Sequence, residues 1–114
     1  MSHDDPAVTD PEFYTVIFEN DRVRVLEYRD RPGDRTHPHR HPDSVMYTLS
    51  GFRRRVSSGD REVEVDLAAG QVRWLAAQEH VGENIGATVT HTILVELKEP
   101  GPAPAPTGVL GPTP

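Results

Sequence analysis

Three of the chain's six histidines lie at alternating positions in one short segment, His37-Pro-His39-Arg-His41. In an extended strand every second side chain projects to the same side, about 6.6 Å apart, so neighbouring members of this row can converge on one ion. The outer two are about 13 Å apart and too distant to share it. Imidazole is a favoured ligand of zinc, iron, copper and nickel. The segment predicts a metal-binding strand or, alternatively, a polar turn with solvated histidines between Pro38 and Pro42.

The composition indicates a single small domain and excludes several classes of function. The chain has 114 residues, 35% hydrophobic side chains and a formal net charge of −6. This acidic balance argues against a nucleic-acid or anionic-membrane partner. The chain has no cysteine, which excludes disulfides, thiolate ligands and a cysteine nucleophile. No apolar run reaches the length of a signal-peptide core or a membrane span, so we expect a cytoplasmic protein.

The two ends of the chain differ in composition from its middle. Residues 1–11 contain one valine and several turn formers, and we expect a flexible N-terminal segment there. Residues 99–114 are rich in proline, which removes the backbone donors of a β-ladder and favours extended, solvated chain. We expect a disordered tail that folding does not need, with docking of Val109 and Leu110 as the alternative. The folded domain is predicted over residues 12–98.

Within this domain the apolar residues recur with a period near two, as in β-strands. Such runs, separated by turn-forming clusters, cover residues 23–25, 45–49, 63–67 and 91–97. No stretch longer than about ten residues keeps a helical period. The pattern predicts an all-β fold, an antiparallel sandwich or barrel.

Two segments resemble the two sequence motifs of the cupin family. Residues 33–51 (GDRTHPHRHPDSVMYTLSG) resemble the first motif, G-x5-H-x-H-x3/4-E-x6-G. Residues 70–84 (GQVRWLAAQEHVGEN) resemble the second, G-x5-P-x-G-x2-H-x3-N. The resemblance spans residues 16–98 and implies a double-stranded β-helix, a conical jelly-roll barrel with a pocket in its mouth. In cupins the motif histidines and glutamate hold a divalent metal ion.

The first motif can be aligned in two registers. The spacing from Gly33 selects His39 and His41 as the paired histidines, and we prefer this register because it preserves the distance from the turn. The alternative pair, His37 and His39, restores the spacing to Ser44 but shortens the distance from Gly33. In the preferred register His37 lies at the rim of the pocket.

The predicted ligand set departs from the cupin pattern at the glutamate. That position falls on Ser44, a poor ligand, with the carboxylate of Asp43 beside it. His80 in the second motif keeps its spacing to the final asparagine. The resemblance therefore implies that His39, His41 and His80 hold one divalent transition metal ion, with Asp43, Ser44 or His37 as possible additions.

Iron, zinc, nickel, copper and manganese are the candidate ions, since neutral imidazoles suit them better than magnesium or calcium. The alternative is a cupin that has lost its metal and keeps the histidines as polar lining. Catalytic residues stay unassigned, with Asp43, His91 and Arg53 as candidates. His91 shares a strand face with Ile93 and is expected to point into the barrel. Either one of Arg53–Arg55 faces the pocket and pairs with a carboxylate, or all three are solvated charges at the edge of the sheet.

The resemblance implies a metalloenzyme of dioxygenase, isomerase or lyase type that acts on a small organic substrate. The alternatives are a non-catalytic module that binds a small molecule, with or without metal, and a metal-free acid-base enzyme. Small cupins commonly pair through their outer sheet. We therefore expect a homodimer that buries Val45, Tyr47 and Leu49 with help from residues 12–20.

Overall fold

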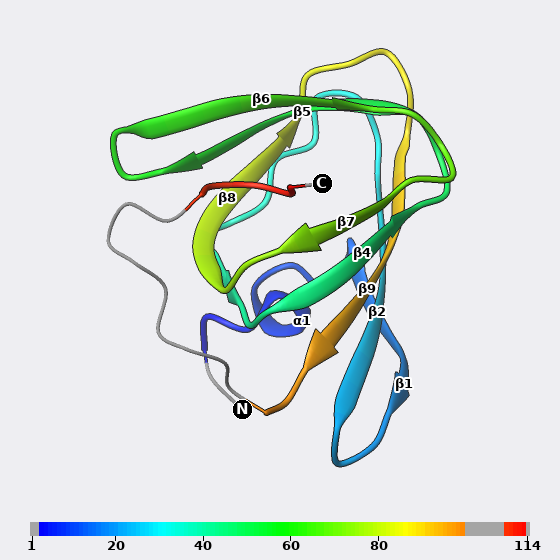
Figure 1. Ribbon diagram of the computed structural model, residues 1–114. Coiled ribbons are helices and arrows are strands. Elements are labelled where there is room, and N and C mark those ends of the chain that lie inside the picture. Colours follow the sequence, from blue (N-terminus) through cyan, green and yellow to red (C-terminus); the bar gives the residue numbers. More distant parts are fainter. Residues whose placement is uncertain (1–2, 100–108, 114) are drawn as a thin grey trace.

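The computed structural model describes residues 3–99 and 109–113 of the chain (Figure 1). Short antiparallel strands make up most of this part. The elements are α1 (Pro6–Thr9), β1 (Tyr14–Glu19), β2 (Val23–Asp30), β3 (His39–His41), β4 (Ser44–Thr48), β5 (Phe52–Ser58), β6 (Arg61–Leu67), β7 (Val72–Leu75), β8 (Gln78–Asn84) and β9 (Thr90–Leu97). Within the described residues, no helix is long and apolar enough to cross a membrane.

The strands form two sheets that face each other. One has the order β1-β2-β9-β4-β7 and the other the order β3-β8-β5-β6 (Figure 1). Apart from the hairpins β1–β2 and β5–β6, strands that follow one another in the sequence lie in different sheets, as in a double-stranded β-helix, and this confirms the predicted all-β jelly-roll fold. The core between the sheets contains Leu26, Tyr28, Met46, Phe52 and Leu94.

β4 and β9 show which side of the larger sheet faces the core. In β4 the buried residues are Ser44, Met46 and Thr48. In β9 the buried positions are Thr90, Thr92, Leu94 and Glu96, whereas the intervening residues are only half-buried. His91 therefore lies on the outer face, and the prediction that it points into the barrel is wrong. Burial alternates along β9 as the sequence pattern predicts. Because both faces of β9 carry apolar side chains, periodicity alone does not identify the inner face.

The outer face of the larger sheet has an apolar row that crosses all five strands. The register aligns Phe18 with Val25, Val25 with Val95, Val95 with Val45, and Val45 with Trp74. Phe18 is 54% exposed and Trp74 is 38% exposed. The three valines between them are half-buried. Apolar surface that stays partly exposed in this way is typical of protein–protein contacts.

The described residues of the N-terminal segment differ from the expected flexible segment. The Asp5 side chain caps α1 by accepting a hydrogen bond from the Ala7 amide at 2.8 Å. Pro6 and Asp10 are fully buried, and the Arg40 amide donates to the Asp4 carbonyl at 2.8 Å. Turn-forming residues often indicate loose chain, but here their polar groups cap a helical turn and bond to the barrel.

The last described residues also differ from the predicted disordered tail. Leu110 is buried, and Thr113 forms an antiparallel backbone bridge with Trp74 of β7. The Gly111 amide donates to the side-chain oxygen of Gln78 at 2.9 Å. This segment, red in Figure 1, runs beside β7. The remainder of the predicted tail, residues 100–108 and 114, lies outside the described residues.

We predict that Leu110→Ala lowers the melting temperature, contrary to the sequence-based expectation of a dispensable tail. Burial of a leucine side chain contributes about 1.5–3 kcal/mol, and ~1 kcal/mol corresponds to roughly 4–8 °C for a domain of this size. Val109→Ala is the matched control, because the Val109 side chain is exposed. Calorimetry of both variants checks this, and equal melting temperatures would reject a stabilising role for Leu110.

The homodimer stays a prediction, and the apolar row on the outer face of the larger sheet is the surface through which we expect the subunits to pair. We expect light scattering to give a mass near twice the 12.7 kDa of one chain. Val95→Glu should yield monomers, because it places a charge in the centre of the row. Val89→Glu adds the same charge in the loop before β9 and should leave the mass unchanged. A wild-type mass near 12.7 kDa at micromolar concentration contradicts the prediction.

Candidate metal centre

Three histidines converge inside the barrel because of the register between β3 and β8. His39 and His41 are two residues apart and project to the same side, and His80 is directly opposite His39 across the ladder. All three are buried, and their potential ligand atoms lie within 4.8 Å of one another. The structure thus brings together the three residues selected in the preferred alignment.

Each of these histidines has an acceptor at its Nδ1 atom. The His39 Nδ1 lies 2.8 Å from the His37 carbonyl oxygen, and the His80 Nδ1 lies 2.7 Å from the Gln78 side-chain oxygen. The His41 Nδ1 lies 3.2 Å from a carboxylate oxygen of Glu96. Because these oxygens accept hydrogen bonds, they favour the tautomer with the proton on Nδ1. The Nε2 lone pairs are then available to a ligand, the arrangement that orients histidines in metal sites.

Burial keeps these imidazoles uncharged. It lowers the pKa of His39 below its usual value. It lowers the pKa of His41 and His80 further, and the neighbouring histidines add to the effect. A metal ion binds the neutral form of imidazole. The cluster is therefore in its binding form at neutral pH.

Tyr14 of β1 adds a hydroxyl group to the cluster. Its oxygen lies 3.3 Å from the His39 Nε2 and 3.4 Å from the His41 Nε2. Burial raises the pKa of Tyr14 above its usual value, so the group is a neutral phenol. One hydroxyl proton cannot serve both nitrogens at once, and at least one lone pair stays available.

Glu96 brings a buried carboxylate next to His41. It lies directly opposite Ser44 in the ladder between β4 and β9, beside the position where the cupin motif has its glutamate. Arg24 holds it at 2.8 Å and in turn pairs with Asp5 at 2.8 Å. Burial nevertheless raises the pKa of Glu96 above its usual value. The carboxylate contacts Nδ1 of His41, so it orients this histidine from the side away from Nε2.

The additional ligands predicted from the sequence do not join the cluster. The Ser44 hydroxyl donates to the Pro42 carbonyl at 2.8 Å. Asp43 accepts a hydrogen bond from the Ala77 amide at 2.8 Å. The His37 side chain is 72% exposed and its Nδ1 lies 2.9 Å from Asp10, so it lies outside the cluster.

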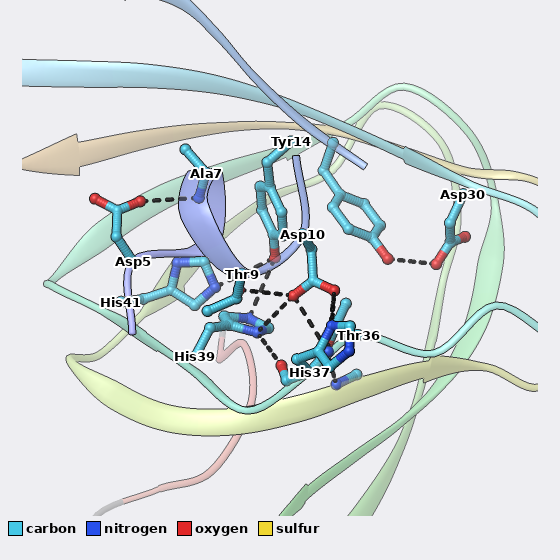
Figure 2. Close-up of polar contacts among 12 residues, drawn as sticks. Asp5, Ala7, Thr9, Asp10, Tyr14, Asp30, Thr36, His37, His39 and His41 are labelled. Carbon is cyan, nitrogen blue, oxygen red and sulfur yellow. Dashed lines mark hydrogen bonds and ion pairs between the residues drawn. The ribbon is translucent and has the colours of Figure 1, made fainter. Parts of the chain in front are cut away.

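Asp10 links the N-terminal segment to the histidine strand. It accepts hydrogen bonds from the His37 amide at 3.0 and 3.2 Å, and one of its oxygens lies 3.8 Å from the His39 Nδ1. Figure 2 shows it reaching from the turn after α1 toward His37 and His39, with Tyr14 beside them. This buried carboxylate fixes the backbone that carries the site.

The histidines form one wall of a cavity of about 60 Å³ between the sheets. Most of the remaining wall is apolar, and Arg54 of β5 also lines it. The other catalytic candidates lie elsewhere: Arg53 pairs with Glu64 on the surface, and His91 lies 2.7 Å from Glu27. The arginine cluster does supply one pocket residue, but it is Arg54 and not the candidate Arg53.

Sequence reasoning missed several residues that surround the histidines. They are Tyr14, Asp10, Gln78 and Glu96. Glu96 lies opposite Ser44 in the pairing of β4 with β9. It would have been identified if the inner face of β9 had been assigned from this pairing. Local pattern carries no such signal for Tyr14 and Asp10, because their positions depend on how the N-terminal segment packs across the barrel.

No protein-family model matches the chain, and no curated protein is significantly similar to it. Several solved structures match the fold. A cupin domain from Bordetella pertussis Tohama I has a TM-score of 0.70 and 28% identity, covering 75% of this chain and 92% of that one. A protein from Klebsiella pneumoniae with a double-stranded β-helix domain has a TM-score of 0.60 and 20% identity, covering 89% and 83%.

The polyketide cyclase RemF from Streptomyces resistomycificus has a TM-score of 0.56 and 21% identity, covering 78% of this chain and 66% of that one. Together with the topology and the two sequence motifs, these likenesses define the class as a double-stranded β-helix. The chain is a small domain of the cupin superfamily.

We predict that the metal-free protein loses stability as the pH falls below the usual imidazole pKa of 6.5. The folded-state pKa values of His39, His41 and His80 are lowered, so the unfolded chain binds more protons in this window. Each histidine contributes up to about 1.4 kcal/mol per pH unit. Glu96 opposes this trend, since its raised pKa favours the fold at lower pH.

Urea unfolding at pH 7.5, 6.5 and 5.5 measures the effect. His80→Gln should show a shallower pH dependence than wild type. His37→Gln is a control whose effect on the pH dependence has the opposite sign, because Asp10 raises the pKa of His37. The contribution of His37 to the stability of the wild-type fold is present below pH 6.5 and is lost as the pH rises through its folded-state pKa. Equal wild-type stability at pH 7.5 and 5.5 would contradict the prediction.

Proposed function

We propose that this cupin binds one divalent transition metal ion through His39, His41 and His80 and acts as a metal-dependent enzyme on a small organic substrate. The observation that carries the proposal is that all three imidazoles leave the same nitrogen, Nε2, for an ion. Each has an acceptor at Nδ1, and the group offers its ligand atoms within one buried cluster. Such a set fits iron, zinc, nickel, copper or manganese.

A bound ion would polarise a carbonyl or carboxylate oxygen of the substrate, or support reaction with dioxygen. The residues of the chain prepare the site for this chemistry. Glu96 and Gln78 hold two of the rings in place, and the neutral Tyr14 hydroxyl can donate a hydrogen bond to an oxygen atom in the cavity. The apolar walls exclude bulk water, which strengthens every electrostatic interaction inside. The same proposal includes a cytoplasmic location for the protein, as expected from the sequence.

A non-catalytic module that binds a small molecule is the alternative. One observation favours it: among the described residues that line the cavity, none is a carboxylate. Proton transfer would then depend on the histidines and on Tyr14. The polyketide cyclase of similar fold shows that an enzyme can have this architecture, but the identity of 21% concerns the fold alone.

We predict that protein purified without added metal contains one equivalent of a transition metal. Elemental analysis should find it in wild type and find at least ten-fold less in His41→Ala and His80→Ala. His37→Ala is the matched control, because its side chain is exposed and lies outside the cluster, and it should keep the metal. Circular dichroism verifies that the β-fold is intact in all three variants.

Two outcomes would overturn the metal site. One is a wild-type protein that takes up no zinc, iron, nickel, copper or manganese during dialysis. The other is full occupancy in His41→Ala together with loss in His37→Ala, which would select the alternative register. Iron content with substrate-dependent oxygen uptake would indicate a dioxygenase, whereas saturable ligand binding without turnover would support the binding module.

A further inference from the structure

The Tyr14 hydroxyl reaches the same nitrogen atoms that His39 and His41 leave for an ion. Its oxygen lies 3.3 Å from the His39 Nε2 and 3.4 Å from the His41 Nε2. Figure 2 shows the ring directed from its strand toward His39. Only 7% of Tyr14 is exposed, so bulk water does not compete for the hydroxyl. The two contacts are either hydrogen bonds or contacts between neighbouring ligands of one ion.

Hydrogen bonding accounts poorly for these two contacts. Hydrogen bonds between a nitrogen and an oxygen atom usually measure about 2.7–3.2 Å, and both distances are longer. The acceptors at Nδ1 of His39 and His41 favour a proton on that nitrogen, so both Nε2 atoms are acceptors. Because the Tyr14 hydroxyl has one proton, it can satisfy only one of them.

The same distances match those between two ligands of one tetrahedral ion. Bonds of about 2.0–2.1 Å to nitrogen or oxygen place two ligand atoms about 3.3–3.4 Å apart, because the edge of a tetrahedron is about 1.63 times the bond length. The Tyr14 oxygen therefore stands at the distance from both imidazole nitrogens that is expected between neighbouring ligands.

Among the described residues, no carboxylate takes the ligand position that glutamate has in cupins. Ser44, which has that position in the sequence, donates to a backbone carbonyl, and Asp43 accepts from a backbone amide. Glu96 contacts His41 through Nδ1, away from the nitrogen that would bind an ion. An oxygen ligand from another part of the chain can therefore complete the site.

The fold holds Tyr14 firmly at the edge of the cluster. Its amide donates to the Asp10 carbonyl at 3.0 Å. It lies opposite Tyr28 in the ladder between β1 and β2, and the centroids of the two rings are 4.6 Å apart. The ring of His39 meets the Tyr14 ring edge-on at 5.6 Å. A side chain packed in this way meets an ion without rearrangement of its strand.

Coordination by Tyr14 would balance the charge of the centre as a glutamate does. The oxygen forms a bond to the ion, and the hydroxyl proton leaves to the solvent. Without an ion the group is a neutral phenol, because burial raises its pKa. A bound divalent ion favours the anion instead, as it does for a coordinated thiol. Since the three imidazoles are neutral, the centre then keeps one net positive charge.

We propose that Tyr14 is the fourth protein ligand of the metal ion, an oxygen ligand from β1 that takes the place of the cupin glutamate. The inference deepens the proposed function and rests on it, because it requires a bound ion. Tyr14 thus has two states. It is a hydrogen-bond donor while the hydroxyl keeps its proton, and a ligand once the ion has replaced that proton.

The test uses iron as the probe, because a phenolate bound to iron(III) gives an intense charge-transfer band in the visible spectrum and imidazole does not. Iron(II) is loaded without oxygen, oxidised with ferricyanide and freed of the oxidant on a desalting column. Wild type should show the band. Tyr14→Phe, which removes only the hydroxyl, should bind iron through the histidines and lose the band.

Tyr28→Phe is the matched control, since it removes a hydroxyl from the same cavity. The Tyr28 hydroxyl donates to Asp30 and not to a histidine, so this variant should keep the band. Circular dichroism verifies the fold of both variants.

Competition with a chromophoric chelator measures the same contact for zinc. Loss of an outer partner of a metal ligand lowers affinity by about 10–100-fold. Loss of a ligand should therefore lower the zinc affinity of Tyr14→Phe at least ten-fold, whereas Tyr28→Phe should keep the wild-type affinity. An undiminished zinc affinity in Tyr14→Phe would contradict the inference.

The spectra separate this inference from the proposed function. A wild-type protein that binds one equivalent of iron without the visible band would overturn the role of Tyr14 and leave the metal site intact. A band that persists in Tyr14→Phe would do the same. A wild-type protein that takes up neither iron nor zinc would reject both proposals. Because the first outcome is read from the wild-type protein, it decides the question even if Tyr14→Phe fails to fold.

Discussion

Three imidazoles buried side by side impose the constraint on which the rest of the site depends. If they were protonated, their charges would repel one another in a medium that screens poorly. Burial and mutual proximity therefore favour the neutral form, as the lowered pKa values indicate. A neutral ring must place its single proton on one nitrogen, and the acceptors at Nδ1 decide which one. The geometry of the Nε2 lone pairs follows from this choice.

The acceptors that impose this choice are supported by both ends of the described chain. Gly111, near the C-terminus, donates to the same Gln78 oxygen that contacts His80. Near the N-terminus, Asp5 pairs with Arg24, which holds Glu96. Through these contacts the terminal segments help to hold the acceptors of His80 and His41 in place. In a domain of this size, where little surface can be buried, such contacts combine stability with the construction of the site.

The cavity has two polar regions separated by apolar walls. The neutral histidines form one, and the Arg54–Asp30 pair with its hydrogen-bonded neighbours Tyr28 and Asn84 forms the other. Since the medium between them is apolar, a charged group in the cavity interacts more strongly with each region than it would in water. The position of Arg54 over Gly82 sets the distance between the two regions.

The sequence by itself predicted the all-β class from period-two alternation, and its resemblance to the cupin motifs predicted the jelly-roll fold and the preferred histidine trio, because alternation and motif spacing are local properties. Only the tertiary structure decided that Glu96 and not His91 faces the core, and that Arg54 and not Arg53 lines the cavity. The physical reason is that alternation shows which residues share a face, but a sheet with apolar side chains on both faces hides which face is inside. Likewise, contacts of Asp10, Tyr14 and Leu110 join parts of the chain that lie far apart in sequence, and no local pattern encodes them.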